Sequence, residues 1–189
     1  MPELILIRHS TSVPDQQRPA QQWGLSTAGR QRCRSLAEQL AGFSLDLLIT
    51  SQERKAWQTA QELAAWLDVP WFTYPDLHEH LRQNTPFFPE PAQFKAAVEK
   101  FFHHPHQLVF GEETAEQTLA RFSNALDKAV QQFPNRSLGV VTHGTVLSLF
   151  VAQRCGLNPW EFWQRLDMPA YVILALPDFK LRSVVERLP

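Results

Sequence analysis

Residues 4–9, with the sequence LILIRH, place His9 at the end of an apolar run, and LGVVTHG at residues 138–144 does the same for His143. Continuous apolar runs of this length are typical of strands that are buried on both faces of a parallel sheet. Because ligands bind at the carboxyl ends of the strands in open α/β sheets, we expect the two imidazoles to meet at one edge. Arg8 adds a planar guanidinium that binds anions, and an imidazole beside it can act as a nucleophile.

Further strands and helices alternate along the chain. Apolar runs predict strands at residues 4–8, 45–50, 70–73, 137–142, 171–176 and 179–186. Apolar residues at helical spacing predict helices at 27–41, 53–67 and 114–133, and a buried helix at 145–155. Since Pro177-Asp178 joins the last two strands as a hairpin, the prediction is an α/β three-layer sandwich. Its central sheet is mostly parallel and mixed at one edge, with helices on both faces.

The composition is that of one globular domain spanning residues 1–189, in which hydrophobic residues make up 44% of the chain. The 18 basic and 19 acidic residues leave a net charge of −1, which argues against a nucleic-acid partner. No apolar segment has the length of a membrane span, and the run at 4–7 is too short for a signal peptide. Cys33 and Cys155 lie far apart, as expected of a protein in the reducing cytoplasm. The oligomeric state stays open.

Residues 74–113 interrupt the alternation of strands and helices, because they are rich in proline and aromatic residues. We expect them to form an excursion over the carboxyl edge of the sheet, with one helical stripe. Two interpretations of the aromatic residues in and near this segment stay open: they line an apolar substrate pocket, or they form a small satellite core. These residues are Trp23, Phe87, Phe88, Phe94, Phe101 and Phe102. The nearby His103, His104 and His106 fit no standard metal-ligand spacing and are expected on a surface turn.

The two histidine motifs resemble those of the histidine phosphatase superfamily, the phosphoglycerate-mutase-like proteins, which carry Arg-His-Gly near the N-terminus and His-Gly far downstream. SQERKAWQTA at residues 51–60 is similar to the family's segment with an arginine at a helix start, and Arg54 matches that arginine. LHEH at residues 77–80 is similar to the family's acid segment, and Glu79 matches the acid. The order of these residues along the chain is also that of the family.

The resemblance implies a metal-independent phosphomonoesterase that acts through a phosphohistidine on a small phosphorylated metabolite, with no cofactor and no metal. His9 becomes the phosphohistidine, while Arg8, Arg54 and His143 hold the phosphoryl group. Glu79 protonates the leaving oxygen and then activates the hydrolytic water. Gly144, after the second histidine, is expected to let the backbone approach the phosphate closely.

The sequence also departs from the family pattern. Ser10 replaces the glycine that usually follows the histidine, and Asp15 stands near a position where the family often has asparagine. We expect Asp15 to point away from the site, because its carboxylate repels phosphate. The chain lacks the long insertions of the mutases, which favours a phosphatase. Two alternatives stay open. The first is a protein phosphohistidine phosphatase, a group that generally lacks the acid represented here by Glu79. The second is a phosphate-binding regulatory module without strong catalysis, an interpretation that the replacement of glycine by Ser10 supports.

Overall fold

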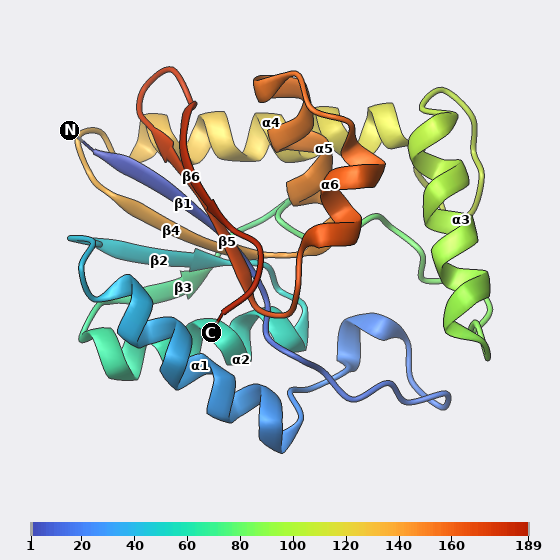
Figure 1. Ribbon diagram of the computed structural model, residues 1–189, viewed down its shortest axis with the longest axis horizontal. Coiled ribbons are helices and arrows are strands. Elements are labelled where there is room, and N and C mark those ends of the chain that lie inside the picture. Colours follow the sequence, from blue (N-terminus) through green and yellow to red (C-terminus); the bar gives the residue numbers. More distant parts are fainter. Residues whose placement is uncertain (1, 189) are drawn as a thin grey trace.

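The computed structural model describes residues 2–188, and its centre is a six-stranded sheet (Figure 1). The strands are β1 (Glu3–Arg8), β2 (Leu47–Thr50), β3 (Trp71–Thr73), β4 (Leu138–Thr142), β5 (Ala170–Ala175) and β6 (Lys180–Val185). They lie in the order β3-β2-β4-β1-β5-β6. The first four of these in space are parallel, whereas β5 and β6 are antiparallel to their neighbours. The prediction of a mostly parallel sheet, mixed at one edge, is confirmed.

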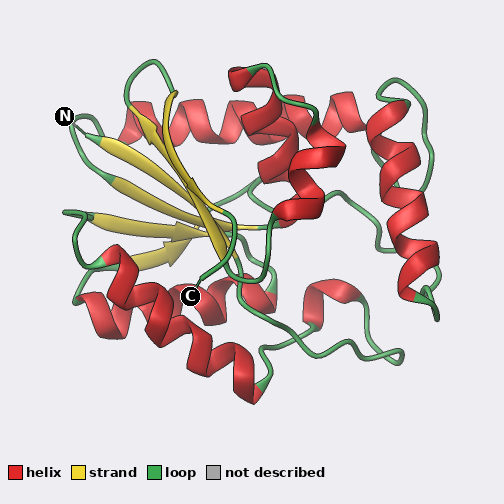
Figure 2. Cartoon of the chain, in the orientation of Figure 1, coloured by secondary structure: helices red, strands yellow, loops and turns green. Residues whose placement is uncertain are grey.

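Helices cover both faces of this sheet (Figure 2). On one face α1 (Thr27–Leu40) and α2 (Arg54–Leu67) pack in a core that includes Ile5 and Ile7 of β1. On the other face α4 (Ala115–Gln132) and α5 (Gly144–Cys155) pack in a core that includes Leu4 and Leu6. Successive side chains of a strand point to opposite faces, so the continuous apolar run of β1 serves both cores. The three-layer α/β prediction is confirmed.

The register of β1 and β4 brings the two histidine motifs together. Arg8 pairs with Thr142 at the carboxyl ends of these parallel strands. His9 continues the pairing, since its backbone N–H donates to the carbonyl of Thr142 at 2.9 Å. His143 is the next residue of the neighbouring chain segment, so both imidazoles leave the sheet at the same edge.

Three further helical elements lie beyond this edge (Figure 1). They are the 3-10 helix η1 (Ala20–Gln22), α3 (Pro91–His103) and α6 (Pro159–Arg165). Neither η1 nor α6 is predicted by the apolar periodicity. The side chain of Asn158 caps α6 by accepting the backbone N–H groups of Trp160 and Glu161, and Pro159 occupies the first helical position, where no N–H is needed. Within residues 2–188, no helix is long and apolar enough to cross a membrane.

Candidate active site

One ring nitrogen of His9 is hydrogen-bonded, and the other is available for reaction. Its Nδ1 lies 2.7 Å from the carbonyl oxygen of Ser10. A carbonyl only accepts, so Nδ1 carries the proton and Nε2 keeps its lone pair. The residue is 6% exposed. Burial, and then the neighbouring His143 and Lys55, lower the pKa of His9 well below its usual value. The imidazole is therefore neutral, and Nε2 can attack an electrophile.

His143 lies beside His9, with the two ring centroids 5.1 Å apart. Its Nε2 is 2.8 Å from the Oγ of Ser51, which also accepts the backbone N–H of Glu53. When the Ser51 hydroxyl donates its own proton to Nε2, Nδ1 of His143 must carry the ring proton. Within residues 2–188 this buried Nδ1 has no hydrogen-bond partner. Burial lowers the pKa of His143 to about 4, although Glu53 acts in the opposite direction.

Arg8 is held by α6 and by Leu166, the residue that ends this helix. Its Nη1 donates to the carbonyl of Leu166 at 2.5 Å, and its guanidinium carbon lies 5.8 Å from the ring centroid of Trp163. A Cβ at Gly144 would lie 3.0 Å from the Cζ and Nε atoms of Arg8, so a glycine there leaves room for the guanidinium rather than for a phosphate at the backbone. The Nε of Arg8 is a second buried donor without a partner in the described chain. Buried donors are nearly always paired in folded proteins, so Nε of Arg8, together with Nδ1 of His143 in the tautomer that protonates it, indicates a place for an anion.

Lys55, and not Arg54, supplies the cation of α2 at this cluster. The Lys55 side chain is 5% exposed, and its Nζ donates to a carboxylate oxygen of Glu53 at 2.5 Å and to the carbonyl of Ala20 at 2.8 Å. It is close enough to both histidines to lower their pKa values, after the larger effect of burial. Neither Lys55 nor its partner Glu53 is predicted as a site residue from the sequence.

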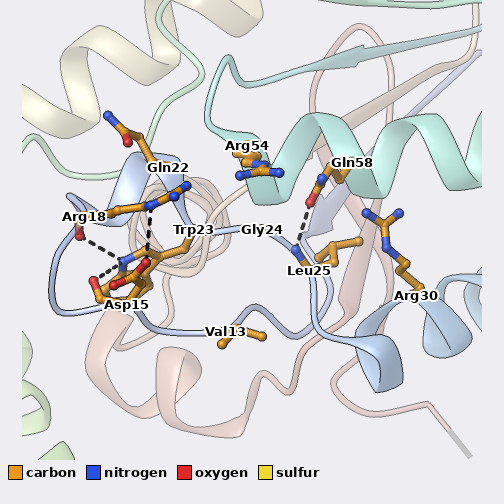
Figure 3. A pocket seen from close by; sticks show the side chains of 10 residues that line it. All are labelled: Val13, Asp15, Arg18, Gln22, Trp23, Gly24, Leu25, Arg30, Arg54 and Gln58. Atoms are coloured by element: carbon orange, nitrogen blue, oxygen red, sulfur yellow. Dashed lines mark hydrogen bonds and ion pairs between the residues drawn. The ribbon is translucent and has the colours of Figure 1, made fainter.

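The structure does not bring Arg54 to the histidines, which corrects the expectation drawn from the family motif. Arg54 is the first residue of α2 and is exposed. Figure 3 shows its side chain in a separate pocket, where it lies against Gly24 and shares the wall with Arg30 and Gln58. Successive helix residues point about 100° apart around the axis, so only one of two neighbouring basic residues can face the cluster.

Glu53 contacts Lys55 with one carboxylate oxygen and Glu79 and His143 with the other. One carboxylate oxygen accepts the backbone N–H of Glu79 at 2.9 Å and lies 3.6 Å from Nε2 of His143. Burial by itself would raise the pKa of Glu53, but His143 and Lys55 outweigh it and hold the pKa below its usual range. Glu53 is therefore ionised, and it compensates the charge of Lys55.

Glu79 lies at the start of α5, next to His143. Its carboxylate accepts the backbone N–H groups of Thr145 at 3.1 Å, Val146 at 3.2 Å and His80 at 2.9 Å. Carboxylates are favoured at this end of a helix, where N–H groups have no partner within the helix. Burial alone would raise the pKa of Glu79, but His143 and Arg82 act against it and the pKa is lowered. Glu79 is thus ionised in the free protein and is held beside the cluster.

At both positions that depart from the family motif, the side chain bonds to groups other than the two histidines. Ser10 is fully buried, and its hydroxyl donates to the carbonyl of Gly29 at 2.7 Å, so it is satisfied within the fold. Asp15 is tied to its own loop, since its carboxylate pairs with Arg18 at 3.3 Å and accepts the N–H of Gln17 at 2.9 Å. The prediction that Asp15 points away from the histidines therefore agrees with the geometry.

Residues 4–183 match the model of the histidine phosphatase superfamily (branch 1). A similar sequence is the uncharacterized phosphatase PhoE of Bacillus subtilis (strain 168), which is 24% identical over 162 residues, or 84% of this chain and 80% of that protein. Among solved structures, YhfR of Bacillus stearothermophilus superposes with a TM-score of 0.77 at 22% identity, covering 98% of this chain and 96% of that one. A mycobacterial glucosyl-3-phosphoglycerate phosphatase gives 0.74 at 20% identity, with coverage of 99% and 96%. The two structural likenesses concern the fold.

Proposed function

The chain belongs to the histidine phosphatase superfamily and is a phosphatase, and from that premise we propose that it hydrolyses small phosphomonoesters through a phosphohistidine at His9. One observation carries the proposal. The Nδ1 of His9 is committed to the Ser10 carbonyl, so the Nε2 lone pair is available beside Arg8, Lys55 and His143. A neutral, oriented imidazole surrounded by cationic and N–H donors is the arrangement that attack on a phosphate ester requires.

In the first step Nε2 of His9 forms a bond to phosphorus while the bond from phosphorus to the ester oxygen breaks. The unpartnered N–H donors of Arg8 and His143 receive the phosphoryl oxygens, and Lys55 adds positive charge. Phosphoryl transfer depends mainly on such positioning and charge stabilisation. We assign no role in this step to Arg54, which is exposed in another pocket. The proposed reaction needs no metal, because these residues supply the positive charge.

Glu79 is proposed to protonate the leaving oxygen and then to activate the water that hydrolyses the phosphohistidine. The carboxylate is ionised in the free protein, so it must acquire its proton when substrate binds. A phosphate placed nearby disfavours a second negative charge and raises the pKa of the carboxyl group. A general acid beside the nucleophile also favours phosphomonoesters over protein phosphohistidine, because an alkoxide leaving group needs a proton and an imidazole leaving group needs less help.

A small substrate is supported by the relatives. The mycobacterial structural neighbour is a phosphatase of glucosyl-3-phosphoglycerate, a small phosphorylated compound. The carboxyl edge of the sheet is also partly covered by η1, α3 and the loops that flank them, as Figure 1 shows. A covered site suits a metabolite better than the side chain of a folded protein.

The test is to trap the phosphoenzyme. Wild type and His9→Ala are mixed with a ³²P-labelled alkyl phosphate in a chelator, quenched in alkali and digested. Label should appear on His9 of wild type, because phosphohistidine survives alkali, and it should be absent from the variant. A chelator-sensitive reaction, or label on a serine such as Ser10 after an acid quench, would refute the proposed mechanism.

A further inference from the structure

A cavity lies between the loop at residues 14–23 and the segment at residues 82–94. Its volume is about 560 Å³, within the range of roughly 300–1,000 Å³ that is usual for small-molecule sites. Prolines and aromatic rings dominate its wall. The contributing residues include Pro14, Pro19, Pro86, Pro89 and Pro91, together with Trp23, Phe87, Phe88 and Phe94.

The aromatic residues singled out in the sequence therefore divide into two groups. Phe101 and Phe102 are 0% and 6% exposed and belong to a core cluster with Trp160. Trp23 and Phe94 line the cavity, where both are half-buried, and Phe87 is 38% exposed; Phe94 also packs against the core cluster. An aromatic residue on a cavity wall, held by its neighbours but open to solvent, is a ready contact for an apolar ligand.

Contacts between the rings hold the two walls of the cavity together. Trp23 and Phe87, which come from opposite walls, meet edge to face with their ring centroids 6.2 Å apart. The indole N–H of Trp23 donates to the carbonyls of Asp15 and Arg18, at 3.0 and 3.1 Å, so the ring is fixed within its loop. Phe88 and Phe94 pack at 5.6 Å on the other wall. The cavity is therefore built by specific contacts.

Three links connect the cavity to the reacting cluster. Ala20, on one wall, accepts a hydrogen bond from Lys55 through its carbonyl. Phe94, on the other wall, lies 6.3 Å from the ring of Trp163, which in turn packs on the guanidinium of Arg8. Arg82 lines the cavity and follows Glu79 by three residues.

Arg82 also ties the two regions together electrostatically. Its guanidinium carbon lies 4.6 Å from the ring centroid of Phe94. Although burial acts in the opposite direction, His143 and Arg82 lower the pKa of Glu79. Arg82, which lines the cavity, is therefore close enough for its charge to act on the carboxylate proposed to protonate the leaving oxygen.

We propose that this cavity binds the alcohol portion of the substrate, and that the substrate is a phosphomonoester whose alcohol carries a flat, largely apolar ring system. The inference rests on the proposed function, because the phosphate at His9 is the anchor that directs the alcohol into the cavity. Stacked or edge-on contacts with Trp23, Phe87 and Phe94 recognise a ring, and the prolines offer further apolar surface. The charged residues that line the cavity, Arg18 and Arg82, are both cationic. We therefore expect the cavity to accept a substrate ring that carries an acidic group and to reject one that carries an ammonium group.

The experiment compares two esters whose alcohols are both primary, ethyl phosphate and 2-(2-naphthyl)ethyl phosphate. Their leaving groups are of similar basicity, so the chemical step treats them alike and the ring is the difference that matters. Wild type should hydrolyse the naphthyl ester with a kcat/KM roughly 10- to 100-fold higher, the scale expected for burial of an aromatic ring system. The corresponding phosphonates, titrated by calorimetry, should show the same order in Kd.

Three variants locate the preference. Phe94→Ala and the more exposed Phe87→Ala should each reduce the ratio of the two kcat/KM values by roughly tenfold or less, by removing one ring contact. Phe72→Ala is the matched control, because Phe72 is 39% exposed on β3 and packs on Phe133 instead. It should leave the ratio as in wild type. Circular dichroism melts verify that each variant is folded.

The outcomes separate the two proposals. Equal kcat/KM values for the two esters in wild type, or a ratio that neither phenylalanine variant changes, would overturn the assignment of the cavity while leaving the phosphatase intact. Failure to hydrolyse either ester would instead count against the proposed function. In that case the phosphonates decide about the cavity, since a tighter Kd for the naphthyl compound supports it and equal Kd values overturn it.

Discussion

The reacting cluster and the cavity wall are built in opposite ways. His9 and His143 follow buried strands, are 6% and 0% exposed, and have one ring nitrogen each fixed by a hydrogen bond. Trp23 and Phe87 stand on irregular segments and are partly exposed. This difference predicts which kinetic quantity a substitution in each region should alter. Substitutions in the cluster should slow all substrates alike, whereas substitutions in the wall should alter the ratio between substrates.

The largest loss of activity is expected from a substitution of Glu79 in the reacting cluster. Glu79→Gln should lower kcat/KM for ethyl phosphate by roughly 10²–10⁴, the usual contribution of a positioned general acid. The loss should be the same for 2-(2-naphthyl)ethyl phosphate, because both alcohols leave as alkoxides. Phosphorylation of His9 by 4-nitrophenyl phosphate, followed in a single turnover, should fall much less. Unequal losses for the two alkyl esters would mean that Glu79 contacts the alcohol and belongs to the wall.

A smaller loss is expected at Lys55, tested against its neighbour Arg54. Removing Lys55 alone leaves Glu53 buried without its partner, so the variant Glu53→Gln/Lys55→Met is the sound choice. We expect its kcat/KM to fall by roughly 10², for the loss of one buried cation near the transferred phosphate. Arg54→Met, which removes an exposed arginine one residue away, should stay within about twofold of wild type. Steady-state kinetics with ethyl phosphate measure kcat/KM of both variants. A larger loss in Arg54→Met than in the double variant would show that Arg54, and not Lys55, contacts the phosphate.

The smallest effect concerns the dependence of stability on pH. Burial lowers the pKa of His143 to about 4 in the folded state, and it also lowers that of His9. The unfolded chain therefore takes up these protons first, and folding is destabilised as the pH falls from about 6.5 towards 4. A histidine that is protonated in the unfolded chain and neutral in the folded protein contributes a slope of up to about 1.4 kcal/mol per pH unit.

Urea unfolding at pH 7, 6 and 5 measures this slope. His143→Gln should reduce it by about one histidine's share, whereas Phe94→Ala, in the cavity wall, should lower stability without changing the slope. An unchanged slope in His143→Gln would show that this imidazole accepts a proton in the folded protein as readily as in the unfolded chain.

The parts of the fold that depend on apolar periodicity were predictable. The strands around His9 and His143 and the helices α1, α2, α4 and α5 follow from buried stripes and runs, because burial on a sheet imposes those patterns. The segment at 159–165 is too short for such a stripe. The pair Asn158-Pro159 is nevertheless a helix-start signal that can be read from the sequence.

The candidate site was predictable where a residue is tied to a strand end, and not where tertiary contacts decide. His9, Arg8 and His143 follow from the two strands, whereas Lys55 precedes the apolar stripe of α2 just as Arg54 does. Lys55 is enclosed by Glu53 and by the distant Ala20 carbonyl, and no local pattern encodes that contact. The division of the aromatic residues between core and cavity depends in the same way on how the irregular segments meet.

The pair formed by Glu53 and Lys55 has a consequence for the end of the catalytic cycle. Among the charged side chains that act on the two imidazoles are the cations Arg8 and Lys55 and the carboxylates Glu53 and Glu79. Because Glu53 neutralises Lys55, inorganic phosphate, the product, meets less net positive charge than the number of cations alone would provide. We expect a substrate whose alcohol also contacts the cavity to compete well with inorganic phosphate, so that the enzyme keeps working as phosphate accumulates around it.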